Sequence, residues 1–226
     1  QKFSSNKNEI ITKPYFDFNY FFNRKNKITP LGNIYDNKVI LITGAGGSIG
    51  SNIVLQLLKT KFKKLILLDN SEYNLYRLSN FIPNKSNIDL SLKSYSEKKE
   101  IIEIFSKYKI DIIFHAAAYK HVPLIEANPF SAIKNNFLDT YEFMKLVTLY
   151  NISFFCLISS DKAVRPTNVM GASKRLAELV CQATAEISHN TIISMVRLSW
   201  YRRWKDWIRG FSIVFRIIVL CRTIFI

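Results

Sequence analysis

The sequence predicts an α/β fold, a doubly wound parallel sheet with helices on both faces. Two observations lead to this prediction. Between residues 38 and 198, short runs of β-branched and apolar residues alternate with amphipathic segments, and the stretch LITGAGGSIGS joins the first apolar run directly to the first amphipathic segment. Such alternation is typical of parallel strands, because each strand needs a crossover helix to bring the chain back.

Six apolar runs predict the strands of this sheet. The third run, IDLSLKSY, is the most polar and is also compatible with a loop, whereas the other five have the apolar composition of buried parallel strands. We expect strands at 38–43, 64–69, 88–93, 111–116, 154–159 and 192–197. We expect helices at 49–60, 72–81, 97–108, 129–150 and 171–188.

Length and composition are those of one globular domain with appendages. The chain has 226 residues, of which 48% are hydrophobic and 22% charged, enough to form a real core. We divide it into an N-terminal arm (1–37), a nucleotide-binding domain (38–198) and a basic, aromatic tail (199–226). The tail is interpreted either as an aberrant end or as a membrane-surface segment, since its apolar run at 211–226 is too short and too charged to predict a membrane span.

Charge and cysteine usage narrow the class of protein further. The net charge of +15 comes largely from lysines scattered along the chain, a pattern of solvated surface that argues against nucleic-acid binding. The cysteines Cys156, Cys181 and Cys221 are odd in number and widely spaced, which fits neither a disulfide framework nor a metal site. We therefore expect a cytoplasmic protein without a metal.

The glycine-rich stretch predicts a dinucleotide site. Gly44, Gly47 and Gly50 follow a strand and open a helix with the spacing G-x-x-G-x-x-G. Such glycines permit a tight turn, close approach of a pyrophosphate to the backbone and close helix-to-strand packing. The second strand ends in Asp69, whose carboxylate can accept both adenosine ribose hydroxyls and favours NAD over NADP. The residues expected to hold this part of the cofactor are Thr43, Gly44, Gly46, Gly47, Ser48, Ile49, Gly50 and Asp69.

Three further motifs indicate which family of dinucleotide-binding proteins this sequence resembles. LLDNSEYNLY, FHAAAYKHVPLIEANP and LISSDKAVRPTNVMGASKRLAE follow the glycine loop in this order. With it they resemble the CapD-type polysaccharide-biosynthesis family, within the extended short-chain dehydrogenase/reductase superfamily of Rossmann-like proteins. The resemblance covers roughly residues 38–198 and implies a UDP-sugar substrate, an NAD or NADP cofactor and a homo-oligomer. After Arg197 the sequence departs from the family, so we expect most of the C-terminal substrate domain to be missing and leave catalytic activity open.

The resemblance also implies the chemistry of a nucleotide-sugar 4,6-dehydratase. Asp161 would protonate the departing hydroxyl at carbon 6 of the sugar, and Lys162 would take the proton at carbon 5. We expect Lys162 to need burial beside Lys174 or the cofactor ring to lower its pKa. The alternative interpretation is that Asp161 and Lys162 are ordinary loop charges capping the next helix.

Other positions follow from the same resemblance. Ser159 or Ser160 would contact the sugar or the cofactor, and Lys174 would hold the nicotinamide ribose. Met170 stands where many nicotinamide enzymes have an acid-base tyrosine, and we expect it to pack against the nicotinamide or the core, because a thioether has no proton to exchange. The remaining expected cofactor contacts are Ala116, Ala117, Ala118 and Asn136, and the expected substrate contacts are Lys120 and His121.

Three functions stay open from the sequence. A 4,6-dehydratase is favoured by the adjacent Asp161 and Lys162. A UDP-sugar 4-epimerase would use the same oxidation at carbon 4 without loss of water. A nucleotide-binding remnant or membrane-attached scaffold would bind the cofactor without turnover.

Overall fold

The computed structural model describes residues 33–83 and 86–198. The predicted tail (199–226) and most of the predicted arm (1–37) therefore lie outside the described residues. The elements are β1 (Val39–Thr43), α2 (Ser48–Leu57), β2 (Lys64–Asp69), α3 (Glu72–Ser79), β3 (Ile88–Leu92), α4 (Lys98–Lys107), β4 (Ile112–His115), α5 (Val122–Ala127), α6 (Pro129–Ile133), a π-helical turn η1 (Lys134–Leu138), α7 (Asp139–Leu149), β5 (Phe154–Ser160), a 3₁₀ turn η2 (Asp161–Ala163), α8 (Val169–Ile187) and β6 (Ile192–Leu198). None of the described helices is long and apolar enough to cross a membrane.

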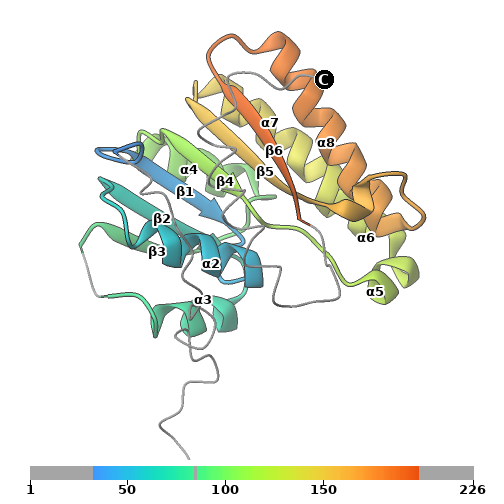
Figure 1. The fold of residues 1–226 in the computed structure, drawn as a ribbon, viewed down its shortest axis with the longest axis horizontal. Helices are drawn as coiled ribbons and strands as arrows, with labels where there is room; N and C mark the ends of the chain where they lie inside the picture. Colours follow the sequence, from blue (N-terminus) through green and yellow to red (C-terminus); the bar gives the residue numbers. More distant parts are fainter. Residues whose placement is uncertain (1–32, 84–85, 199–226) are drawn as a thin grey trace, which may run out of the picture. The chain divides into compact units, whose positions relative to one another are not determined.

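All six predicted strands form one parallel sheet in the order β3-β2-β1-β4-β5-β6 (Figure 1). The predicted doubly wound fold is confirmed. The strand order reverses direction between β1 and β4, where Thr43 lies beside His115. In open α/β sheets, ligands bind outside the carboxyl ends of the strands at such a reversal point. The topology therefore locates the candidate site before any side chain is considered.

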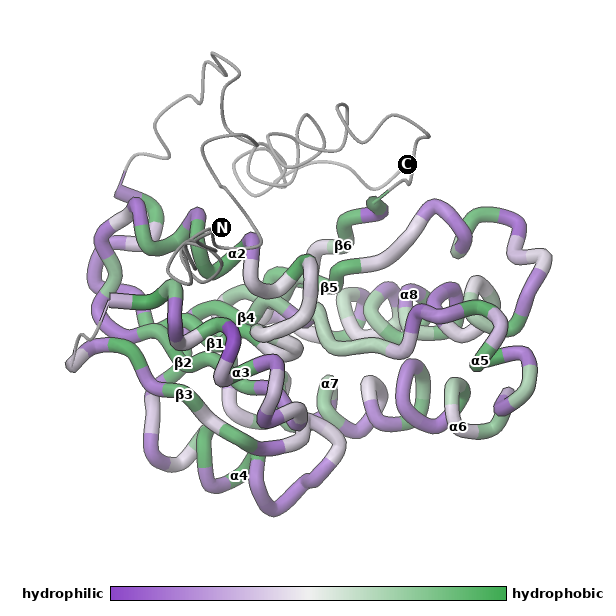
Figure 2. The backbone as a smooth tube through the Cα atoms, turned by 90° about the horizontal axis from the view of Figure 1, so that it is seen from below, coloured by the Kyte–Doolittle hydropathy of each residue, from purple (hydrophilic) through white to green (hydrophobic). Residues whose placement is uncertain are grey.

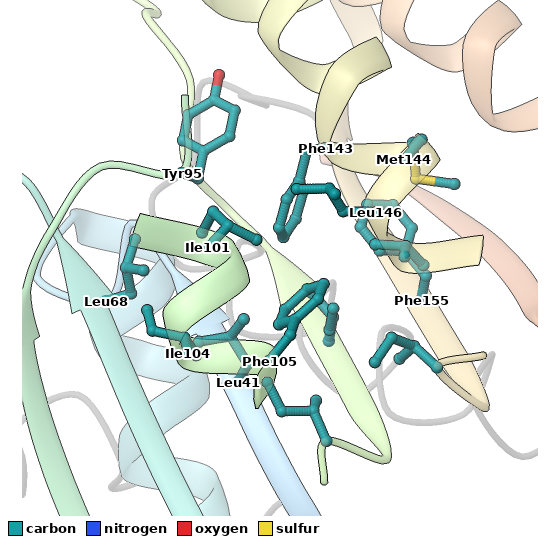
Figure 3. Packing of buried hydrophobic residues seen from close by; sticks show 14 of the residues in the cluster. Leu41, Leu68, Tyr95, Ile101, Ile104, Phe105, Phe143, Met144, Leu146 and Phe155 are labelled. Carbon is teal, nitrogen blue, oxygen red and sulfur yellow. The ribbon is translucent and has the colours of Figure 1, made fainter. Parts of the chain in front are cut away.

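A single large apolar cluster fixes the sheet to three helices. Side chains of α4, α7 and α8 pack on one face, with Phe105, Phe143 and Phe155 at its centre (Figure 3). The strands alternate, so Leu41 faces this cluster while Ile40 and Ile42 face the other side. Figure 2 shows the hydrophobic residues concentrated along the central strands, with hydrophilic residues along the outer helices. This packing holds the carboxyl ends of β1, β4 and β5 in fixed relative positions.

The polar third strand forms at the edge of the sheet. Within residues 33–83 and 86–198, β3 pairs only with β2, and its Leu90 and Leu92 are exposed. An edge strand is half solvated, so a polar composition is compatible with it. The strand interpretation of this run is thus confirmed, and the loop interpretation is wrong.

The helix expected at 129–150 is not one regular helix. It consists of α6, the π-helical turn η1 and α7. A short helix not expected from the sequence, α5, precedes it and contains Pro123 in its first turn. The π turn inserts one residue into the helical ladder and changes the side-chain phase, which turns Asn136 into the buried interior.

His115, at the end of β4, is a structural residue in the core. It is 1% exposed, its Nδ1 shares a hydrogen bond with Thr43 Oγ1 at 2.7 Å, and its ring packs against Tyr95 and Phe143. Burial, and secondarily the nearby charge of Lys174, lower the pKa of His115 to about 3. The imidazole is therefore neutral in the folded protein at neutral pH and remains so well below pH 6.

The neutral state of His115 predicts a pH dependence of stability. Because the unfolded chain takes up a proton on this side chain below about pH 6.5 and the folded chain does not, the free energy of unfolding falls with decreasing pH. The expected slope from this residue approaches about 1.4 kcal/mol per pH unit between pH 6 and pH 4. Urea unfolding of the wild type and His115→Gln measures it: the stability difference between them should shrink as the pH falls. Parallel profiles would contradict the assignment.

Candidate functional site

The glycine loop lies at the carboxyl end of β1 and leads into α2. Gly44 has a positive φ of 65°, a backbone conformation that glycine adopts without strain. At Gly50 an added Cβ atom would lie 2.0 Å from the Gly44 carbonyl oxygen, so only glycine permits this contact between helix and turn. Gly47 stands at the N-cap of α2 and no side chain caps the helix start. The start of α2 is thus compatible with the phosphate site that the sequence predicts.

Asp69 ties the glycine loop to the end of β2. Its Oδ2 accepts a hydrogen bond from the Gly46 amide at 2.9 Å, and its Oδ1 accepts one from the Ser71 amide at 2.9 Å. The side chain is buried. A carboxylate oxygen has more than one acceptor position, so both ribose hydroxyls can still be bound. Asp69 therefore orients the phosphate loop in addition to its predicted contact with the ribose.

The segment after β4 lies beside the glycine loop and is held by Asn136. The Asn136 side chain accepts from the Tyr119 amide at 2.8 Å and donates to the Tyr119 carbonyl oxygen at 3.0 Å. It also donates to Ser173 Oγ on α8 at 3.0 Å. Asn136 thus positions the chain that passes the cofactor site.

Two basic residues of this segment were expected to meet the substrate. Lys120 Nζ donates to Ser48 Oγ at 3.2 Å, so the ammonium group lies at the start of α2, where a phosphate of the cofactor is expected. His121 is exposed at the start of α5. Ala116, Ala117 and Ala118, which precede these two residues in the same segment, are small and partly exposed. An added Cβ at Gly44 would lie 2.7 Å from the Ala117 amide nitrogen.

The acid and base pair follows β5 in the turn η2. Ser160 Oγ donates to Asp161 Oδ1 at 3.0 Å and accepts from the Lys162 amide at 3.3 Å. Lys162 Nζ lies 3.9 Å from Asp161 Oδ1, and the two side chains are 38% and 39% exposed. Lys162 is therefore partly exposed in the structure. The pair does not cap α8, whose N-cap is Asn168.

Lys174 is the buried lysine of the site. It is 8% exposed, and its Nζ donates to the Ile158 carbonyl oxygen at 2.9 Å. Burial lowers the pKa of Lys174 to about 8, while Cys181 and Glu178 act in the opposite direction. A proton on this lysine can therefore be exchanged near neutral pH.

Met170 and Ser159 are both buried, and their side chains contact other residues of the protein interior. Met170 is 4% exposed and packs with Ile125 and Ala132, so the predicted packing in the core is confirmed. Ser159 is buried, and its Oγ donates to Glu178 Oε1 at 2.7 Å. Of the two serines, it is therefore Ser160 that contacts the pair Asp161 and Lys162, because its hydroxyl donates a hydrogen bond to Asp161.

Gly171 and Glu178 matter to the site and were not singled out from the sequence. An added Cβ at Gly171 would lie 2.2 Å from the Lys162 carbonyl oxygen, so this glycine lets η2 lie directly against α8. Glu178 binds Ser159 and, through two bonds, Arg197. A glycine inside a helical pattern is a signal of close backbone approach, whereas a helical glutamate carries no comparable signal.

Several known proteins are similar to this chain in sequence. The chain is 43% identical over 165 residues to the capsular polysaccharide biosynthesis protein CapD of Staphylococcus aureus, covering 71% of this chain and 28% of that protein. It is 30% identical over 158 residues to a UDP-N-acetylglucosamine 4,6-dehydratase (inverting) of Campylobacter jejuni, covering 70% and 46%. It is 30% identical over 171 residues to a UDP-glucose 4-epimerase of Rickettsia bellii, covering 73% and 49%. This chain therefore spans less than half the length of each of these relatives.

A solved structure and a protein-family model also match this chain. The X-ray structure of Pen from Bacillus thuringiensis matches with a TM-score of 0.67 at 30% identity, covering 73% of this chain and 51% of that chain. The model of the family described as polysaccharide biosynthesis protein matches residues 40–199, which include the glycine loop, the segment after β4 and the turn η2. The chain belongs to this polysaccharide biosynthesis protein family, within the extended short-chain dehydrogenase/reductase superfamily.

Proposed function

We propose that the protein is an NAD(P)-dependent nucleotide-sugar 4,6-dehydratase of capsule or surface polysaccharide biosynthesis, acting on a UDP-N-acetylglucosamine-like substrate. The observation that carries this proposal is the pair Asp161 and Lys162, both partly exposed, in a turn that packs at Gly171 against α8, the helix that also carries the buried Lys174. An epimerase needs no such second acid and base. The proposed setting is the cytoplasm, where free thiols such as the buried Cys156 and Cys181 persist.

The residues of the site fit a nicotinamide dinucleotide. The turn at Gly44, the uncapped start of α2 and the Asp69 carboxylate suit a pyrophosphate and an adenosine ribose. Lys120, bonded to Ser48, adds a positive charge for the phosphates. When bound, the cofactor supplies a hydride acceptor for carbon 4 of the sugar.

The residues of η2 and α8 account for the proton transfers. Lys174, with a pKa of about 8, can take the proton of the 4-hydroxyl during oxidation, directly or through water. The resulting 4-keto group acidifies the proton at carbon 5, which Lys162 removes. Asp161 protonates the hydroxyl that leaves carbon 6, and Ser160 orients Asp161 through its hydrogen bond. The hydride removed from carbon 4 then returns to carbon 6 and a proton returns to carbon 5, so that the overall change is the loss of one water.

We further propose a preference for NAD over NADP, because the buried Asp69 carboxylate would repel a 2′-phosphate. Asp69→Asn should weaken NAD binding at least about tenfold, since hydrogen bonds to charged groups contribute about 1.5–3 kcal/mol. The preference for NAD should shrink at the same time. Fluorescence titration with NADH and NADPH measures both affinities. Glu72→Gln, which removes an exposed charge from the first turn of α3, is the control and should change neither; an undiminished preference in Asp69→Asn would contradict this role.

The alternatives are separated by one incubation with UDP-N-acetylglucosamine followed by mass spectrometry. Loss of one water from the sugar supports the dehydratase. A product of unchanged mass with inverted configuration at carbon 4 supports a 4-epimerase, which the relative in Rickettsia bellii also favours. Unchanged substrate together with retained NAD binding supports a nucleotide-binding protein without turnover.

A further inference from the structure

A cluster of ions surrounds the buried carboxylate of Glu178 near the end of β5. Glu178 is 1% exposed. Its Oε1 accepts from Ser159 Oγ at 2.7 Å and Arg197 Nε at 2.8 Å, and its Oε2 accepts from Arg197 Nη2 at 2.7 Å and Arg175 Nη1 at 3.0 Å. Burial alone would raise the pKa of Glu178, but the bonds from Arg197, Ser159 and Arg175 outweigh burial and lower it. The carboxylate therefore remains ionised inside the protein.

Lys174 and Glu178 form hydrogen bonds with consecutive residues of strand β5. They are four positions apart on α8, one helical turn, and so lie on the same face of the helix. Lys174 binds the carbonyl oxygen of Ile158, and Glu178 binds the hydroxyl of Ser159. The next residue of β5 is Ser160, which leads into the proposed acid and base pair.

We propose that Glu178 is a positioning residue for Lys174: it holds α8 against the carboxyl end of β5 and supplies the negative charge that keeps the Lys174 ammonium ionised. This inference rests on the proposed function in one respect, the contact of Lys174 with the nicotinamide ribose. It adds a residue that does not itself touch substrate or cofactor. Arg197, which shares the Glu178 carboxylate, moderates its effect on Lys174.

The other groups around Lys174 do not supply this charge. Burial raises the pKa of the Cys181 thiol far above its ordinary range and lowers that of His115 to about 3, so both are neutral between pH 6 and pH 10. Arg175 and Arg197 are cations throughout this range. Of Cys181 and Glu178, the two groups that act against the effect of burial on Lys174, Glu178 is thus the one that is ionised in this range.

The affinities for oxidised and reduced cofactor report the charge of Lys174 without any turnover. The oxidised nicotinamide is positively charged and the reduced ring is neutral, so an ammonium nearby weakens NAD⁺ relative to NADH. The ratio of the dissociation constant of NAD⁺ to that of NADH should therefore fall as the pH rises through the pKa of Lys174. Lys174→Met should remove this pH dependence and so assigns it.

The test is this ratio measured between pH 6 and pH 10 in matched variants. In Glu178→Gln the fall should move to lower pH by about one unit. Arg197→Gln removes a cation that partly neutralises Glu178, and it alters a side chain that is 44% exposed. In this variant the fall in the ratio should move to higher pH. Glu186→Gln removes an exposed charge near the end of the same helix and should leave the curve unchanged.

The outcomes separate this inference from the proposed function. Shifts of opposite sign in the Glu178 and Arg197 variants support it, because general destabilisation moves both the same way. A pH-dependent ratio in the wild type with unshifted curves in both variants overturns the role of Glu178 alone. A ratio without pH dependence, or no binding of either cofactor, overturns the placement of Lys174 and with it both proposals. If Glu178→Gln does not fold, the direction of the shift in Arg197→Gln decides.

Discussion

Gly50→Ala is expected to lower the free energy of unfolding by about 3 kcal/mol or more, the upper part of the range for overpacked sites. The new methyl carbon would lie 2.0 Å from the carbonyl oxygen of Gly44 and 2.8 Å from its carbonyl carbon. Both atoms belong to the backbone, so α2 must move away from the turn. The same displacement should abolish NAD binding, because the first amides of α2 would no longer face the phosphate position.

Gly47→Ala is the matched control for Gly50. There an added Cβ meets only the Gly44 carbonyl oxygen, at 3.2 Å, and φ is −67°, which alanine adopts freely. Chemical unfolding of the two variants measures the difference in stability, and NADH titration of Gly50→Ala against the wild type measures the loss of binding. Equal stability of Gly50→Ala and Gly47→Ala would show that the helix start adapts and that the close contact is unimportant.

Lys162→Met is expected to slow elimination of water by at least about 100-fold, the lower end of the range for loss of a general base. The oxidation at carbon 4 does not use Lys162, so absorbance of the reduced cofactor should still appear when substrate is added. Cofactor affinity should be unchanged, because the Lys162 side chain is 38% exposed and its backbone contact with Gly171 remains.

The reference for Lys162→Met is Lys99→Met, which replaces an exposed lysine on α4. Product mass and absorbance followed in parallel distinguish the two half-reactions. Dehydration at the wild-type rate in Lys162→Met would remove Lys162 from the mechanism. Loss of cofactor binding would instead assign it a structural role in η2.

The strands and the glycine loop could be predicted because their signals are local. Each buried parallel strand is a short apolar run, Gly44 is required by its own positive φ, and Gly50 is required by its contact with Gly44, six residues earlier in the chain. The π turn could not be predicted, because it places Asn136 against Tyr119, and no local pattern encodes a contact between those two residues. The short α5 was missed because six residues with Pro123 give no helical period.

The burial of the two lysines of the site could not be predicted from the sequence. Burial was a condition for Lys162 to act as a base, whereas the structure leaves Lys162 partly exposed and buries Lys174. The difference arises because η2 turns Lys162 outward at the end of β5 while Lys174 lies on the inner face of α8. The ion cluster at Glu178 was missed for a similar reason: Ser159 and Arg197 each lie nineteen residues away from it in the chain.

The double hydrogen bond of Asn136 to Tyr119 has a kinetic consequence. One side-chain amide binds both backbone groups of Tyr119, much as a neighbouring strand would, so the segment after β4 is ordered without any ligand. A cofactor that enters a preformed site pays little conformational entropy. Binding of NADH should therefore follow a single exponential whose rate rises linearly with concentration, without the plateau that a slow loop closure would impose.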